Sequence, residues 1–144
     1  MEYSCIKLND LPDEILMIIL KKLHYIDVLY SLISVDKRLN AIASDSVFTK
    51  DLALMSTSSN DLSYEFTDPI LDRFYLQILP KINYKIEWLN VESSSMQRIL
   101  LPTNYPNLHG LGLYNLASNT ARDLFTGKIF SLTLLMINHI RILK

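Results

Sequence analysis

The sequence predicts an α+β fold, in which an N-terminal three-helix section is followed by a short, irregular α/β array. Two observations lead to this prediction. Apolar residues recur at helical spacing in three short segments within residues 8–54. Beyond a polar stretch at residues 55–68, a strand-like spacing of apolar residues occurs three times within residues 69–144. A chain of 144 residues is long enough for one ordinary domain or two small ones.

The first predicted helix runs from Pro12 to about Leu23. Pro12 suits a first helical turn, where its missing N–H would be unpaired anyway. Asp13 and Glu14 then place negative charge at the positive end of the helix dipole. Residues 15–20 are six consecutive apolar residues, so the helix is apolar on two sides. This is more apolar surface than a small helical core can cover, and it predicts a binding partner.

Two shorter helices are expected at residues 28–33 and 37–43, with Asp27 as a plausible N-cap before the first. A last turn, carrying apolar residues of 47–54, would complete the section. One side of the first helix is expected to pack on the inward-facing residues of these helices. The other side, with Pro12 at its tip, is expected to stay exposed. The inward-facing residues would be Leu29, Leu32, Leu39 and Ile42.

The second section begins after residues 55–68, which are polar and are interpreted as a linker or surface loop. A helix is expected over residues 69–79, ended by Pro80. The strand-like spacing follows at intervals of 22 and 24 residues, within the range of leucine-rich repeats. Its three copies are Ile86, Leu89 and Val91, then Leu108, Leu111 and Leu113, then Leu132, Leu135 and Ile137.

The predicted array is irregular. The asparagine that usually follows the last leucine of the motif by three residues is replaced by Ser94, Leu116 and Ile140. Residues 96–101 and 121–125 suit short helices between the strands. The sequence stops just past the third copy, without a polar capping unit. We therefore expect a piece of a longer array, or an end that is covered in some other way.

Composition weighs against several classes of function. The net charge is −1, so lysine and arginine are not in excess, which weighs against nucleic-acid binding. One cysteine, Cys5, excludes an intrachain disulfide framework and fits a reducing compartment. The sequence has neither a secretory signal nor an apolar stretch long enough to span a bilayer. We expect a cytoplasmic or nuclear protein, or one found in both, with no membrane partner.

No combination of residues in the sequence has the spacing of a known catalytic or metal site. His24, His109 and His139 are widely separated, and no further cysteine or histidine completes a metal site near them. The three glycines form no phosphate-binding loop. The sequence therefore predicts a protein that is not an enzyme, with no catalytic residue, no metal and no cofactor.

The N-terminal section resembles an F-box. The family pattern is a Leu-Pro-x-Glu opening, an apolar helix ending in leucine, a short helix opening with an acid and leucine, and a Val-x-Lys/Arg-Arg segment. All four parts occur in order. A tryptophan often follows the arginine in the family, and Leu39 stands there in this chain. The residues that carry the resemblance are Leu11-Pro12-Asp13-Glu14-Ile15-Leu16, Ile19, Leu23, Asp27-Val28-Leu29, Val35-Asp36-Lys37-Arg38-Leu39, Ala43-Ser44-Asp45 and Phe48.

F-box domains bind the Skp-family adaptor of SCF (cullin–RING) E3 ubiquitin ligases, and leucine-rich repeats commonly follow them. The resemblance therefore implies a non-catalytic substrate receptor, which would bring a target protein to ubiquitin-dependent degradation. The alternative is a non-enzymatic interaction protein with no link to a cullin ligase. The adaptor contacts that the resemblance implies are Leu11, Pro12, Ile15, Leu16, Ile19, Leu23, Leu29, Leu32 and Val35.

The target protein would bind the predicted strands. Alternate residues of a strand point to one face, and in a regular array that face would carry Trp88, Asn90, Glu92 and Tyr114. Trp88 and Tyr114 are the best anchors because aromatic residues dominate binding hot spots. A core position for Trp88 is an equally good interpretation. The sequence does not identify the target.

Overall fold

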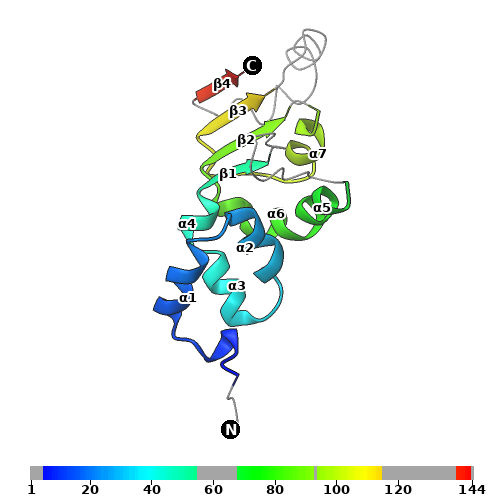
Figure 1. The fold of residues 1–144 in the computed structure, drawn as a ribbon. Helices are drawn as coiled ribbons and strands as arrows, with labels where there is room; N and C mark the ends of the chain where they lie inside the picture. Colours follow the sequence, from blue (N-terminus) through cyan, green and yellow to red (C-terminus); the bar gives the residue numbers. More distant parts are fainter. Residues whose placement is uncertain (1–4, 55–67, 93, 115–138, 144) are drawn as a thin grey trace, which may run out of the picture. The chain divides into compact units, whose positions relative to one another are not determined.

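The structure is a computed structural model that describes residues 5–54, 68–92, 94–114 and 139–143. It contains two compact units, residues 1–48 and 49–144, and each is described here by itself. Helices and strands are both present, which confirms a mixed fold (Figure 1). Within the described residues, no helix combines the length and the apolar character that crossing a membrane requires.

The first unit is helical, and the three predicted helices are confirmed with shifted ends. A short 3₁₀ turn precedes them. A fourth helix, α4, follows them in the sequence and includes the last residues of the unit. The elements are 3₁₀ helix Leu8–Asp10, α1 Asp13–Leu20, α2 Tyr25–Leu32, α3 Lys37–Ala43 and α4 Ser46–Thr49.

The N-caps explain where α2 and α3 begin. The prediction of Asp27 as the cap of α2 is wrong, because the helix starts earlier and His24 caps it, with Nδ1 accepting from the Ile26 N–H at 3.4 Å. Asp36 caps α3, since its Oδ1 accepts from the Leu39 N–H at 2.8 Å. The hydrogen bond from the Leu39 N–H is the largest cause of a lowered pKa at Asp36, and a hydrogen bond from the Asn9 side chain lowers the pKa further.

The core of the first unit takes its residues from all four helices. Every member is an apolar side chain that is nearly or completely inaccessible to solvent. They are Leu16, Leu20, Ile26, Val28, Leu29, Leu32, Ile33, Leu39, Ile42, Ala43 and Phe48.

The second unit contains a parallel sheet of four strands in the order β1-β2-β3-β4. The strands expected from the first two copies of the spacing are confirmed as β2 and β3. Apolar residues at equivalent positions of the spacing are directly opposite each other, as Leu89 and Leu111 show. The strands are β1 Asp51–Leu54, β2 Trp88–Glu92, β3 Gly110–Tyr114 and β4 His139–Leu143.

Two of these strands differ from the prediction. Leu52 and Leu54, which were expected in a helical turn, are buried in β1, so the first unit ends at Phe48 rather than after residue 54. The third copy of the spacing lies outside the described residues. The strand that pairs with β3 is β4, which places Ile140 opposite Leu111 and Ile142 opposite Leu113.

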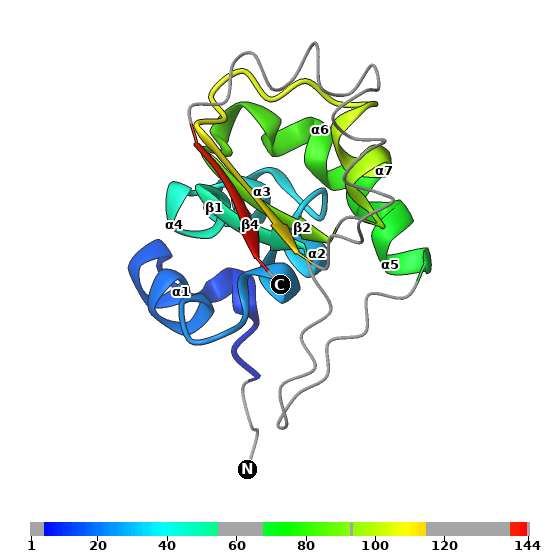
Figure 2. The same ribbon diagram turned by 90° about the horizontal axis from the view of Figure 1, so that it is seen from above.

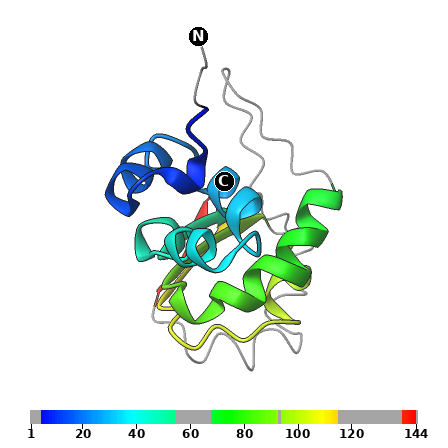
Figure 3. The ribbon, with the colours of Figure 1, turned by 90° about the horizontal axis from the view of Figure 1, so that it is seen from below.

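Helices of the second unit pack on one face of the sheet, and Figure 2 shows α6 and α7 on the same side. The helix predicted over residues 69–79 does not end at Pro80, because the helical backbone continues through it. A π-helical turn lies just before Pro80, and its wider path makes room for the proline ring. Figure 3 shows this green stretch as a continuous helical ribbon. The elements are α5 Asp68–Arg73, π-helical turn Phe74–Ile78, α6 Leu79–Ile82, 3₁₀ helix Asn83–Lys85 and α7 Met96–Leu100.

Side-chain contacts hold α7 to the other helical segments and to the loop after it. Arg98 of α7 pairs with Asp72 of α5 at 2.5 Å, and its guanidinium lies over the Tyr75 ring at 5.1 Å. Tyr105 donates its hydroxyl hydrogen bond to the Ile99 carbonyl at 2.8 Å. Burial raises the pKa of Tyr105. These contacts join α7 to the other helical segments on one face of the sheet. We call the opposite face of the sheet its outer face.

Candidate functional site: two interaction surfaces

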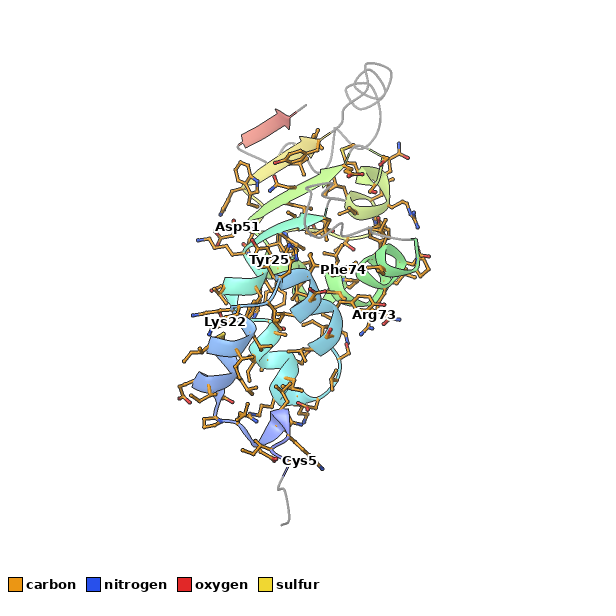
Figure 4. All side chains as sticks on the ribbon, in the orientation of Figure 1. Cys5, Lys22, Tyr25, Asp51, Arg73 and Phe74 are labelled. Carbon is orange, nitrogen blue, oxygen red and sulfur yellow. The ribbon has the colours of Figure 1, made fainter. Side chains whose placement is uncertain are left out.

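Several exposed apolar side chains gather on one face of α1. Ile18 and Ile19 lie about one helical turn after Ile15, and the three are 54%, 39% and 43% exposed, while Leu23, just beyond the helix, is 50% exposed. We call Pro12 and these four residues the α1 surface. The opposite side of the same helix carries Leu16 and Leu20, both buried. Lys22, labelled in Figure 4, follows the helix and is exposed.

Most of the adaptor contacts expected from the sequence lie at the surface. Pro12, Ile15, Ile19 and Leu23 belong to the α1 surface, and Leu11 is half-buried beside them. Val35 is 59% exposed. It follows Ser34, whose φ of 73° turns the chain between α2 and α3.

Three of the expected contacts are corrected by the structure. Leu16, Leu29 and Leu32 are buried in the core of the first unit, so they are not available to a partner in this conformation. Ile18 is more exposed than the other large apolar residues of α1 but was absent from the expected set. Its position three residues after Ile15 was the sequence signal for it.

An arginine of α3 holds the segment that leads into α1. Arg38 donates from Nη1 to the Asn9 carbonyl at 2.7 Å and from Nη2 to the Leu11 carbonyl, and its Nε donates to Asp13 Oδ1 at 2.7 Å. Asn9 also donates to Asp36 Oδ2 at 3.1 Å. We call this set of contacts the Arg38 brace. It holds the backbone before Pro12 and the side chain of Asp13 after it.

Arg38 has a specific structural role, because its guanidinium donates to two backbone carbonyls and a carboxylate of another segment. The sequence signal was the Val-x-Lys/Arg-Arg segment, which the F-box resemblance had already included. The contacts give that segment a physical role in positioning the start of α1.

Replacing Arg38 by alanine is expected to lower the free energy of unfolding of the first unit by about 1–2 kcal/mol, because three charge-assisted hydrogen bonds are lost at a half-exposed site. Lysine should recover less than half of this loss, because one ammonium cannot serve three separated acceptors as a planar guanidinium does. Amide hydrogen exchange of residues 8–16 in the full chain measures the effect. Unchanged exchange rates in Arg38→Ala would contradict the bracing role.

The outer face of the sheet carries the residues that the sequence predicted for target binding. Trp88, Asn90 and Glu92 alternate along β2 with buried Leu89 and Val91. The exposed residue Asp51, labelled in Figure 4, is the β1 partner of Trp88, and Tyr114 is the β3 partner of Glu92. All four predicted target contacts are half-buried, so Trp88 is neither fully in the core nor fully exposed.

Two glycines of β3 shape this outer face. A Cβ on Gly110 would collide with the six-membered ring of Trp88, and a Cβ on Gly112 would collide with Asn90 Oδ1. Trp88 Nε1 also donates to Asn90 Oδ1 at 2.9 Å. The side chains of β2 therefore lie across the backbone of β3, and the two glycines allow it.

Among residues 5–54, 68–92, 94–114 and 139–143, no three His, Cys, Asp or Glu side chains come together in a way that could hold a metal ion. The two surfaces offer exposed apolar area on α1 and a mixed aromatic and polar face on the sheet.

No protein-family model matches this chain, and no curated protein matches it.

Proposed function

We propose that the chain is a substrate-receptor subunit of an SCF E3 ubiquitin ligase. The α1 surface binds a Skp-family adaptor, and the outer face of the sheet binds the target protein. The chain itself performs no chemistry. The observation that carries the proposal is the α1 surface, because it lies within the segment that carries the F-box residue pattern.

The exposed apolar side of α1 supports the binding of an external partner. A surface helix normally hides its apolar stripe in its own domain. Here Leu16 and Leu20 already supply that buried stripe, and Ile15, Ile18 and Ile19 form a second one that stays exposed. Contiguous exposed apolar side chains of this size mark interaction sites.

The binding free energy that the α1 surface can contribute is moderate. Fully burying an isoleucine or leucine contributes about 1.5–3 kcal/mol, so half-exposed side chains contribute about 1 kcal/mol each. The isoleucines and the leucine of the α1 surface, together with Val35, then contribute about 5 kcal/mol in total. The free-energy cost of association would largely offset this contribution. A stable complex therefore requires a wider interface. Lys21 and Lys22 are exposed next to this surface and suit an acidic rim on the adaptor.

The arrangement of strands in the second unit supports the receptor role. Its four parallel strands align apolar positions across the sheet, and other segments of the unit cover one face. Leucine-rich repeats place one strand per repeat in a parallel sheet whose exposed face binds partners. The outer face would therefore hold the target while the first unit binds the adaptor.

Reconstitution from purified proteins tests this proposal. The full chain is mixed with a purified Skp-family adaptor, and then with the adaptor bound to its cullin. We expect a one-to-one complex with a dissociation constant of about 1 μM or lower, and cullin recruitment only when the adaptor is present. A lack of adaptor binding at tenfold higher concentrations would overturn the proposal. Adaptor binding without cullin recruitment would contradict the ligase role.

A further inference from the structure

The indole of Trp88 is held in a defined position on the outer face of the sheet. It covers Gly110, and its Nε1 is hydrogen-bonded to Asn90 at 2.9 Å. Asn90 is itself placed over Gly112. Because Trp88 remains half-exposed, part of the ring is accessible from solvent in this fixed orientation. A ring held in this way loses little conformational entropy when a ligand stacks on it.

A carboxylate lies on the other side of Trp88, away from Gly110. Asp51 is the direct partner of Trp88 in the parallel pairing of β1 and β2, and it is exposed. Both residues alternate with buried leucines on their strands, so they share the outer face. The neighbouring cation, Lys50, is ion-paired with Glu87 at 3.4 Å.

The other charges of this face can be placed by register. Glu92 lies on β2, two positions beyond Asn90, and adds a second carboxylate. The row that contains Trp88 has a carboxylate on its β1 side and Gly110 on its β3 side. The end of this row formed by β1 and β2 is negative.

We propose that Asp51 and Trp88 together bind an arginine side chain of an extended, basic segment of the target protein. The aliphatic stem of an arginine can lie on the indole while its guanidinium donates two hydrogen bonds to the carboxylate on the neighbouring strand, and an ammonium cannot make this bidentate contact. Charge complementarity and the fixed indole both favour this occupant. The inference deepens the target-binding half of the proposed function, on which it rests, and names the chemistry of the segment that is recognised.

Short labelled peptides test this assignment on the full chain. Three pools share the same neutral, randomised flanks and differ in the central residue, which is arginine, its uncharged isostere citrulline, or glutamate. Fluorescence anisotropy gives the affinity for each pool. Trp88 is the single tryptophan of the chain, so its emission reports directly on whether the site is occupied.

We expect the arginine pool to bind about tenfold more tightly than the citrulline pool and to change the emission of Trp88. Asp51→Asn, at an exposed position, should reduce this preference about fivefold. Gly110→Ala should reduce it as well, because the added Cβ displaces the indole while Asp51 stays in place. Glu14→Gln is the control, since it removes one negative charge at an exposed position outside the sheet and should leave the preference unchanged.

Equal affinity for the arginine and citrulline pools would overturn the inference, as would tighter binding of the glutamate pool or no binding of any pool. An arginine preference that survives Asp51→Asn would also overturn it. The same protein preparations are tested for adaptor binding. Normal adaptor binding without an arginine preference rejects only this inference, whereas an arginine preference without adaptor binding rejects the ligase proposal and leaves this site standing.

Discussion

Replacing Leu16 by alanine is expected to lower the free energy of unfolding of the first unit by about 2–5 kcal/mol. Leu16 is completely buried, although it lies within a run of six apolar residues of which three are substantially exposed. Removing its side chain leaves a cavity among packed residues and also loses apolar burial. A loss of this size is a large part of the stability of a small domain.

Ile18→Ala is the matched control for this prediction. Ile18 lies on the same helix but is 54% exposed, so its truncation should change the free energy of unfolding by less than about 0.5 kcal/mol. Amide hydrogen exchange of α1–α3 in the full chain measures both variants, and Trp88 fluorescence follows the second unit separately. Equal destabilisation by the two variants would contradict the orientation of α1.

The helices of the first unit were predictable because their signals are local. Pro12, the acids that follow it and the cap at Asp36 specify helix starts within a few residues. The side of α1 that becomes buried was harder to predict. A continuous apolar run from Ile15 to Leu20 gives no periodicity to distinguish two sides, and only packing against α2 and α3 decides which side is buried.

The strands were also predictable only where the local sequence pattern was unambiguous. β2 and β3 were found because their apolar residues recur at the same spacing, whereas β1 is a short strand whose two leucines also fit a helical turn. At the end of the chain, the spacing fits Leu132, Leu135 and Ile137, and it also fits Ile137, Ile140 and Ile142. Pairing with β3 selects the second set for β4, and this pairing is a long-range property of the sheet.

The candidate sites were predictable by residue type but not by contact. Trp88 and Asn90 were expected on one face of a strand, but their arrangement over Gly110 and Gly112 depends on the register between β2 and β3. Arg38 was visible as part of a motif, but its three acceptors come from a segment about 25 residues earlier. Contacts across such distances are set by the fold, and a local pattern does not contain them.

Ile18→Asp is expected to weaken adaptor binding by at least about thirtyfold, if the α1 surface is the adaptor site as proposed. A carboxylate at the centre of an apolar interface would be desolvated without a partner, which costs about 2–5 kcal/mol. The fold should tolerate the change, because the side chain is more than half exposed in the free chain. Titration calorimetry with the purified adaptor gives the affinity, and hydrogen exchange confirms that α1 is intact.

Val47→Asp separates a specific contact from a general effect of added charge. Val47 is an exposed aliphatic residue of α4, with 49% exposure against 54% for Ile18. It lies outside the α1 surface, so adaptor affinity should stay within about twofold of the wild type. Leu16→Asp would not be informative, because it would unfold the unit that presents the surface. If Ile18→Asp bound the adaptor normally, α1 could not be the adaptor site, and its exposed isoleucines would then belong to an interface with a different partner.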